Sequence, residues 1–277
     1  LLRGRDINKW KIMYKHLYLI HSVDGLDTKN KYPLVYNFLS QYQDKLENRY
    51  DKGRNWYNLR ACKYDDLFEK EKIVYSEIVP EPRFVYDENK FFMEATGFIL
   101  NSSEINLKYL VSLLNSKLLF WYFKDIGYNL GGKGFRYKKI FIEQLPIKIA
   151  DKFREEELTG LVEKILKVNK NFVNETDSFI KYMIEEIDVI KISNKLENYY
   201  NLSQKEFLKE ISKQKGKLSN ESLKKSLIQK FENSCEKLEE MNSNINYLEL
   251  NMDEIIYSIY DINEDERFLI EKELENI

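Results

Sequence analysis

The spacing of hydrophobic residues changes character near residue 150. Before this point, short hydrophobic runs are separated by turns rich in Gly, Pro, Asn and Asp, which is typical of strands and short helices. After it, apolar residues recur at helical spacing over long stretches that contain no proline. The sequence therefore predicts an α+β fold, with a mixed, β-rich domain over residues 1–150 and a long α-helical region over residues 151–277.

The first part combines strand patterns with helix patterns. Runs rich in β-branched and aromatic residues favour strands, and Pro33 is typical of the first turn of a helix. We expect strands at Ile12–His21, Lys72–Val79, Phe84–Tyr86 and Phe91–Leu100, with a turn at Asp24-Gly25. We expect helices at Leu34–Arg49, with Leu34, Phe38, Leu39, Tyr42 and Leu46 on one face, and at Asn106–Phe123. A short helix or turn is expected near Asp65–Glu69, and Arg136–Gln144 is a short helix or an extended piece.

The second part reads as helices throughout. Two long amphipathic patterns are typical of antiparallel, coiled-coil-like pairing. A less periodic, Lys-rich stretch, Leu202–Ser219, separates them. The long patterns cover Leu158–Ile190 and Leu223–Leu250, and two short terminal helices are expected at Met252–Tyr260 and Glu264–Leu274.

The balance of basic and acidic residues also changes near residue 150. The net charge is only −2, but residues 1–150 carry 25 Lys and Arg against 18 Asp and Glu, and residues 151–277 carry 19 against 28. A basic first half and an acidic second half indicate different tasks, and like charge keeps the acidic half away from phosphate. The aromatic content is high, with 20 Tyr, 16 Phe and 3 Trp, which suits both a core and base stacking.

The cysteine content and the hydropathy of the chain indicate where in the cell we expect the protein. The two cysteines imply no disulfide framework, and we find neither a signal peptide nor a membrane-spanning apolar run, so we expect a cytoplasmic protein with no membrane partner. The chain opens on Leu1-Leu2 in what reads as the middle of an element, so we expect it to be a fragment with something missing upstream.

The motifs of common enzymes are absent. The run Gly131-Gly132-Lys133-Gly134 lacks the spacing and the Lys-Ser/Thr pair of a phosphate loop. Asp66, Glu69, Glu71 and Lys72 contain the letters of a metal nuclease, but the acids precede the strand, and we interpret them as a solvated charge run. The Asn/Asp-Pro-Pro-aromatic tetrapeptide of amino-methyltransferases does not occur. We therefore expect no catalytic residue, no metal site and no enzyme activity in this stretch itself.

Four stretches in register resemble the C-terminal specificity domain of the TaqI type, over about residues 1–150. Glu71 stands where that family often has Pro, and Met252 to Glu266 is similar to the tail that ends such enzymes, which suggests the natural C-terminus. The matching stretches are Leu2-Arg3-Gly4-Arg5-Asp6-Ile7, then Phe68 to Tyr75 with Pro82-Arg83-Phe84, then Tyr109 to Leu118, and finally Glu143-Gln144-Leu145-Pro146-Ile147.

The resemblance implies a particular setting. Family members recognise double-stranded DNA next to an upstream methyltransferase domain that uses S-adenosylmethionine to methylate adenine N6, within restriction–modification or phage-exclusion systems. In fused restriction enzymes a nuclease that uses Mg²⁺ precedes that domain. The resemblance therefore implies a target-recognition module of bacterial defence, with duplex DNA and the missing methyltransferase domain as partners and no cofactor of its own.

Three regions supply candidate DNA contacts. Arginine pairs bidentately with guanine, lysine suits phosphate, and glycine lets the backbone approach. Arg3 and Arg5 could contact either DNA or the missing domain, and Lys205–Lys217 could add a phosphate contact. The candidates are Gly132, Lys133, Arg136, Tyr137, Lys138 and Lys139 in the segment Gly127–Lys139, then Arg54, Asn55 and Arg60 in Arg49–Arg60, and finally Arg83, which could equally pair with Glu81 or Glu77.

Two other functions remain open. A non-catalytic scaffold would use the aromatic half as an adaptor and the long helices for dimerisation. Salt distinguishes the two readings, because phosphate-driven binding weakens steeply with ionic strength and apolar helix pairing does not. An independent nuclease would require Mg²⁺-dependent cleavage by this chain. The DNA target sequence and the oligomeric state do not follow from the residues.

Overall fold

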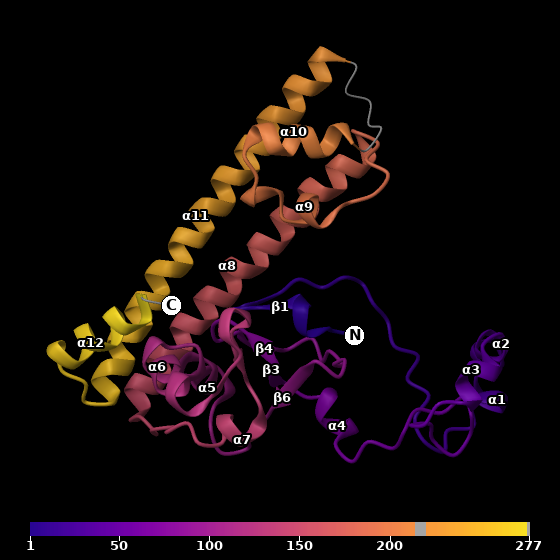
Figure 1. Cartoon of the computed structure of the whole chain (residues 1–277), viewed down its shortest axis with the longest axis horizontal. Coiled ribbons are helices and arrows are strands. Elements are labelled where there is room, and N and C mark those ends of the chain that lie inside the picture. Colours follow the sequence, from indigo (N-terminus) through magenta and orange to yellow (C-terminus); the bar gives the residue numbers. More distant parts are fainter. Residues whose placement is uncertain (214–219, 276–277) are drawn as a thin grey trace.

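The computed structural model describes residues 1–213 and 220–275. Three parts are distinguishable (Figure 1): small antiparallel sheets with helices packed beside them, a long helical hairpin formed by the second half of the chain, and a small lobe of short helices at one end. The predicted α+β class, with a mixed first part followed by a long helical region, is confirmed.

Three small sheets form the first part. In the central one, β3 (Lys72–Ser76) lies between β5 (Phe84–Asp87) and β6 (Gly97–Leu100). All pairings are antiparallel, with Val74 opposite Val85 on one side and Ile99 on the other. Every residue of β3 and β5 is buried, which explains why their sequences are nearly continuous in apolar residues. The sheets are β1 (Ile7–Asn8) with β2 (Lys11–Ile12), then β5 (Phe84–Asp87), β3 (Lys72–Ser76) and β6 (Gly97–Leu100), and finally β4 (Ile78–Val79), β8 (Phe135–Arg136) and β7 (Tyr128–Asn129).

Two strand predictions were wrong in part. The expected strand Ile12–His21 is regular only at Lys11–Ile12, and residues 13–23 are irregular, although the Asp24-Gly25 turn is present. The expected strand Phe91–Leu100 is regular only from Gly97, because the chain turns at Glu94–Thr96 before it joins β3. Apolar residues in the irregular parts of both stretches cover the sheet as loops. Among them, Tyr14 packs its ring on Phe91 with centroids 4.8 Å apart.

The expected helix Asn106–Phe123 is two helices, α5 (Leu107–Leu114) and α6 (Lys117–Ile126). The break lies at Asn115 and Ser116. The Asn115 side chain accepts from Phe84 N at 3.0 Å and donates to Phe84 O at 2.8 Å, as a strand would, and Ser116 caps the next helix. These buried hydrogen bonds join the helix break to the sheet, so Asn115 and Ser116 serve the packing of the domain.

A lobe of short helices replaces the predicted helix Leu34–Arg49. The helix is interrupted near Tyr42. The predicted apolar face is not buried: Leu34 is 83% exposed and Phe38 is 48% exposed. The lobe instead contains a buried polar cluster in which the Ser22 hydroxyl is hydrogen-bonded to Thr28 and accepts from the Asn58 side chain. Its helices are α1 (Thr28–Lys31), α2 (Pro33–Ser40) and α3 (Gln43–Glu47).

The second half folds back on itself as a hairpin. Its two long helices run antiparallel and pack along their apolar faces, as predicted (Figure 1). Met252–Tyr260 is not a separate helix, because the second long helix continues through it to Ile259. Part of the Lys-rich Leu202–Ser219 stretch lies outside the described residues. The elements are α8 (Lys152–Glu185), α9 (Asn194–Glu197), η3 (Tyr199–Asn201), α10 (Gln204–Ser212), α11 (Glu221–Ile259) and α12 (Glu264–Glu275).

One hydrophobic core joins the sheets to the base of the hairpin. It contains Ile73 and Leu113 from the first part together with Val162 and Ile256 from the second, and all four side chains are fully buried. A separate core around Phe207 fills the far end of the hairpin. Within the described residues no helix is both long and apolar enough to span a membrane.

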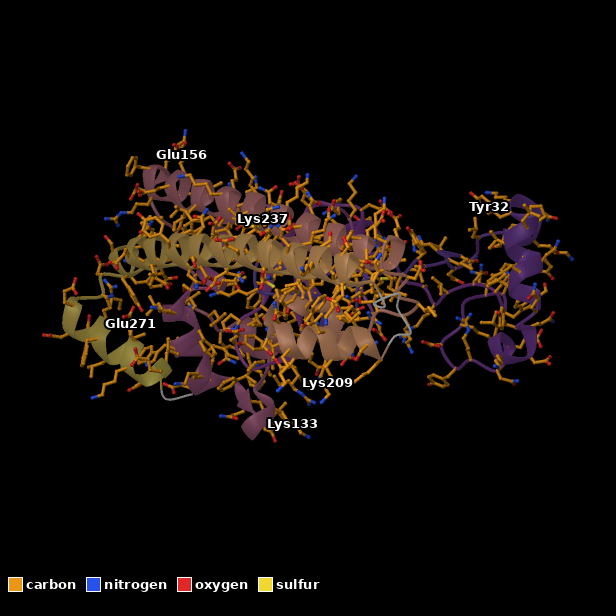
Figure 2. All side chains as sticks on the ribbon, turned by 90° about the horizontal axis from the view of Figure 1, so that it is seen from above. Tyr32, Lys133, Glu156, Lys209, Lys237 and Glu271 are labelled. Carbon is orange, nitrogen blue, oxygen red and sulfur yellow. The ribbon has the colours of Figure 1, made fainter. Side chains whose placement is uncertain are left out.

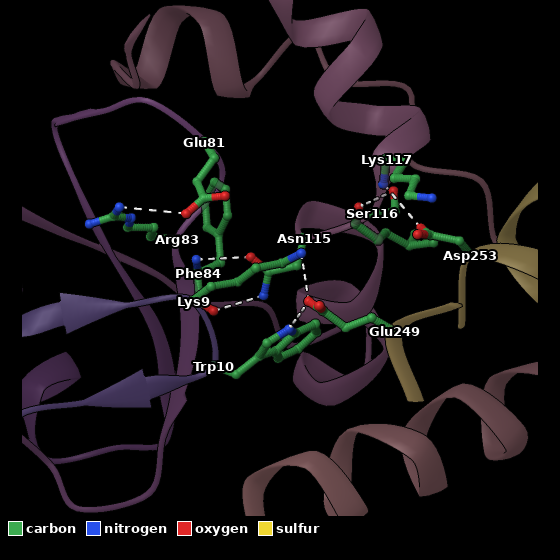
Figure 3. A network of polar contacts seen from close by, with 11 residues as sticks. Lys9, Trp10, Glu81, Arg83, Phe84, Asn115, Ser116, Lys117, Glu249 and Asp253 are labelled. Atoms are coloured by element: carbon green, nitrogen blue, oxygen red, sulfur yellow. Dashed lines mark hydrogen bonds and ion pairs between the residues drawn. The ribbon is translucent and has the colours of Figure 1, made fainter. Parts of the chain in front are cut away.

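Polar contacts reinforce this junction (Figure 3). Glu249 of α11 accepts from the indole of Trp10 at 2.5 Å and pairs with Lys9 at 2.6 Å. Asp253, one turn further along, accepts from Lys117 N at 3.0 Å and so caps α6 beside Ser116. The hairpin therefore holds both the turn between β1 and β2 and the start of α6.

Lys72 is not part of a solvated charge run, which corrects its interpretation, whereas Asp66, Glu69 and Glu71 are exposed as expected. The Lys72 side chain and that of Asp87 are both 0% exposed, and the two charged groups lie 2.7 Å apart across β3 and β5. The ammonium also donates to Phe68 O at 3.0 Å, at the end of α4 (Asp65–Phe68). Lys72 thus ties the short predicted helix to the sheet.

Candidate nucleic-acid interface

A cleft of about 590 Å³ opens where the turn η1 (Gly4–Asp6) meets the ends of β3 and β4. Three arginines, Arg3, Arg5 and Arg83, line it together with the carboxylates of Glu77 and Glu94. Guanidinium groups donate hydrogen bonds and carboxylates accept them, so this lining matches the mixed donors and acceptors of base edges in the DNA major groove. We call it the arginine cleft.

The turn η1 is held tightly against the sheet. Gly4 N donates to Thr96 Oγ1 at 3.1 Å, and the Ser76 hydroxyl donates to Gly4 O. A Cβ at Gly4 would lie 2.8 Å from Thr96 O, so the close approach requires glycine. The flanking arginines are consequently carried on a fixed piece of backbone.

The arginines differ in how they are held. Arg3 is bidentate to the buried carboxylate of Asp6, with contacts of 3.0 and 2.8 Å. Arg83 lies 3.5 Å from Glu81, which is one of the two partners considered for it. Arg5 is exposed, and among the described residues it has no acidic partner. Arg5 therefore presents the free guanidinium of the arginine cleft.

The glycine-rich segment forms a turn beside this cleft. Strands β7 and β8 pair, and between them lies η2 (Gly131–Lys133), where Gly132 and Lys133 are exposed. Gly134 has φ +92°, and a Cβ there would lie 2.5 Å from Val79 O. Glycine at this position lets the turn fold onto β4, and Figure 2 shows Lys133 at the outer edge of the molecule.

The pairing of β8 with β4 brings the glycine-rich segment to the arginine cleft. Arg136 is opposite Ile78, and its Nε lies 3.5 Å from Glu77 Oε1, an ion-pair contact whose geometry does not form a hydrogen bond. Lys138 and Lys139 follow at the start of α7 (Lys139–Ile142) and are exposed. Lys139 pairs with Glu143 at 3.1 Å, whereas Lys138 has no acidic partner among the described residues.

Tyr137 does not lie on this surface. Its side chain is 2% exposed, and its ring stacks on Phe123 with centroids 4.2 Å apart and planes 10° apart. Burial raises the pKa of its hydroxyl well above the ordinary value. The expectation that Tyr137 contacts DNA is therefore wrong, because alternation along the strand turns this ring into the core while its neighbours face outward.

The Arg49–Arg60 candidates lie on the lobe, which Figure 1 shows apart from the strands β1, β3, β4 and β6. In Figure 2 the lobe, marked by Tyr32, also lies far from Lys133. Arg54 is 78% exposed, with its Nε 3.5 Å from Asp24. Asn55 is exposed and donates to the Asn58 side chain at 3.0 Å. Arg60 is also exposed. The structure thus brings Arg83 and the glycine-rich segment together but leaves these three residues as a second, separate group.

Two features of the site were not identified from the sequence. Arg3 and Arg5 could not be assigned, because only the folded structure places η1 beside Arg83. Glu77 was considered only as a possible partner of Arg83, whereas the structure shows that it separates β3 from β4 and lines the arginine cleft. A charged residue within an apolar strand run was the available indication.

Comparison with known proteins identifies the family. Residues 1–147 match the model of the TaqI-like C-terminal specificity domain, and residues 151–256 match a domain of unknown function, DUF8810. The chain belongs to the TaqI-like C-terminal specificity domain family, so the proposed resemblance is confirmed. Its first part is accordingly a recognition domain of the kind found in restriction–modification systems.

Curated relatives of this chain are methyltransferases. The chain is 24% identical over 180 residues to the type II methyltransferase M.BanIII of Aneurinibacillus aneurinilyticus, covering 60% of the chain and 30% of the relative. It is 27% identical over 193 residues to the type II methyltransferase M.MjaIV of Methanocaldococcus jannaschii, covering 65% and 62%. The chain therefore spans less than two thirds of the length of either relative.

Proposed function

We propose that this chain is the sequence-specific, duplex-recognition module of a DNA methyltransferase in a restriction–modification system. The observation that carries the proposal is the arginine cleft beside an exposed glycine-rich turn, in a domain of the TaqI-like specificity family. The excess of basic residues over residues 1–150 supports it, because phosphate attraction supplies much of the affinity for DNA.

The two parts of the surface have different tasks in this proposal. Lys133 and Lys138 are exposed ammonium groups that bind phosphates, and Gly132 allows the backbone to approach the strand. Arg5 is the base reader, because its guanidinium is free to pair with guanine O6 and N7. Arg83 and Arg136 each lie 3.5 Å from a carboxylate, that of Glu81 and of Glu77, and keep further N–H donors for the duplex.

The lobe is a second contact region. Arg54, Asn55 and Arg60 are exposed on it, at one end of the molecule, where they reach a stretch of duplex away from the arginine cleft. Its exposed rings, Tyr32 and Tyr50, suit stacking on bases or packing on sugars. Lys205 of α10 belongs to the proposed weaker phosphate contacts.

Methyl transfer belongs to another part of the protein in this account. The curated relatives are type II methyltransferases, which supports a methyltransferase activity housed in a separate domain. That S-adenosylmethionine is its cofactor, adenine N6 its acceptor, and bacterial defence in the cytoplasm its setting is part of the proposal and comes from the family resemblance. The scaffold alternative is not favoured, because α8 and α11 pair with each other and so cover the faces that would dimerise.

A selection from a library of randomised duplexes tests the proposal. The chain is expected to enrich a short, defined motif, and a scrambled duplex is expected to compete poorly for it. Enrichment of no motif, or equal competition by the scrambled duplex, contradicts sequence-specific recognition. Cleavage of the selected duplex with Mg²⁺ present would instead support an independent nuclease.

A further inference from the structure

An apolar side chain stands among the charged groups of the arginine cleft. Ile78 of β4 lines the cleft and is 42% exposed, and Pro80, two residues further on, is also exposed and lines it. The other exposed groups of the lining include the guanidinium of Arg5 and the carboxylate of Glu94. Single exposed apolar residues are common on protein surfaces, so what distinguishes Ile78 is its place among groups that suit base edges.

The register of the small sheet formed by β4, β8 and β7 fixes the direction of the Ile78 side chain. Ile78 is directly opposite Arg136, and Arg136 is opposite Tyr128. Side chains that are directly opposite each other in an antiparallel sheet lie on the same face. The next row, Val79 with Phe135, is buried in the core. Because successive residues of a strand alternate between the two faces, Ile78 points outward together with Arg136 and Tyr128.

The backbone that carries Ile78 is held in place. Strand β4 pairs with β8, and Tyr137 N donates to Glu77 O at 2.7 Å, immediately before Ile78. The branched side chain of isoleucine has few rotamers. Ile78 is therefore presented to the cleft on a fixed strand and with little conformational freedom of its own.

Arg136 places hydrogen-bond donors beside this apolar group. Its side chain is partly exposed on the face that it shares with Ile78. Neighbouring strands lie about 4.8 Å apart, and the base pairs of a duplex are stacked about 3.4 Å apart. Side chains that are opposite each other in this sheet therefore reach the same base pair or adjacent ones.

The major groove offers one kind of apolar group to such a side chain. Among the edges of the four standard bases, the C5-methyl group of thymine is apolar, and the other groups that distinguish the bases are hydrogen-bond donors and acceptors. Burying a donor or acceptor against Ile78 without a partner costs free energy, whereas burying a methyl group is favourable. 5-Methylcytosine carries the same methyl group at the same ring position. A C5-methylated pyrimidine is thus the base that matches Ile78.

We propose that Ile78 is a specificity-determining residue, which contacts the C5-methyl group of a pyrimidine beside the base pair that the arginines of the cleft contact. This assignment rests on the proposed function, because it needs a duplex in the arginine cleft. The methyl group packs on the Ile78 side chain, and the neighbouring guanidinium groups pair with polar base edges. Thymine and 5-methylcytosine both meet the requirement, and duplexes that differ in one methyl group distinguish them.

Duplexes of this kind test the proposal. In the motif that the unaltered chain selects, each thymine is replaced in turn by uracil, and each cytosine in turn by 5-methylcytosine. Fluorescence anisotropy gives the dissociation constants. If the base is thymine, uracil at one position is expected to weaken binding about fourfold, the effect of losing one buried methyl group. If it is 5-methylcytosine, methylation of one cytosine is expected to strengthen binding by about the same factor.

Variants of Ile78 connect this effect to the side chain. Ile78→Ala truncates the side chain at Cβ and is expected to bind the methylated and unmethylated duplexes equally. Ile78→Val removes only the terminal methyl group, preserves the β-branched shape that suits a strand, and is expected to keep a smaller preference for the methylated duplex. Ile190→Ala, the control, shortens an exposed isoleucine beyond the end of α8 and is expected to keep the full preference.

Two outcomes contradict the assignment of Ile78 and leave recognition of DNA intact. The first is a selected motif in which no exchange of a methyl group changes the affinity. The second is a preference for the methylated duplex that Ile78→Ala retains in full. If the unaltered chain selects no motif at all, the proposed function fails and the assignment of Ile78 fails with it.

Discussion

Replacing Lys133 and Lys138 with glutamine should reduce the salt dependence of DNA binding. Both ammonium groups are exposed, and among the described residues neither has an acidic partner, whereas Lys139 is paired with Glu143. Each phosphate contact contributes about 0.9 to the slope of log affinity against log salt. The double variant should therefore lower the slope by about 1.8.

This change is large enough to measure. Between 50 and 200 mM salt, a difference of about 1.8 in slope means that the affinity of the variant falls about tenfold less than that of the unaltered chain. Fluorescence anisotropy with a labelled duplex at several salt concentrations gives both slopes. Lys164 and Lys167 provide a matched control, because they are exposed lysines of α8 and their replacement by glutamine changes the net charge equally.

Comparing the two double variants tests whether Lys133 and Lys138 themselves bind phosphates. If phosphate attraction is local to the glycine-rich turn, only Lys133→Gln with Lys138→Gln changes the slope. Equal slopes for the two variants would mean that net charge, and not this surface, sets the affinity. A slope unchanged from that of the unaltered chain would refute the assignment of these two lysines to phosphates.

Three further predictions concern the scaffold. Lys72→Met leaves Asp87 buried without its partner and should lower the free energy of unfolding by about 3–5 kcal/mol in urea, and a loss below about 1 kcal/mol would contradict the buried pair. Burial raises the pKa of Asp253 to about 6 from 3.8, so the folded state holds this proton more tightly than the unfolded chain does. Stability should therefore fall by up to about 3 kcal/mol as pH rises from about 4 to 6, and Tm measured across this range should lose that step in Asp253→Asn. Asn115→Leu leaves the N–H and C=O of Phe84 unpaired and should cost about 2–4 kcal/mol in urea unfolding, together with weaker duplex binding through the neighbouring arginine cleft, and unchanged stability would contradict the account of the helix break.

Local patterns were sufficient where burial and periodicity agree. The strand Lys72–Ser76 is buried along its whole length, and the long helices α8 and α11 bury a regular stripe, so each was predicted from its sequence. The glycine-rich segment was also identified as an exposed basic turn, because its glycines and lysines allow few other roles.

Tertiary contacts explain what the sequence did not predict. The helix break at Asn115 depends on hydrogen bonds to Phe84, 31 residues away. The helix face at Leu34 has the pattern of a core but lies on a lobe that has no core to join. The sequence left open whether Arg5 contacts DNA or the missing domain, and only the packing of η1 against the sheet places it beside Arg83. In each case the missing information is which distant segment lies opposite.

The most direct test of the central claim is a parallel selection from a randomised duplex library with three proteins: the unaltered chain, Arg5→Ala, and the control Lys164→Gln with Lys167→Gln. The account predicts the same motif for the unaltered chain and the control. It predicts that Arg5→Ala loses the preference for guanine at one position, equivalent to about 1–3 kcal/mol of discrimination, and keeps the others. Identical motifs and weights for all three proteins, or no motif for any, would contradict recognition of DNA by the arginine cleft.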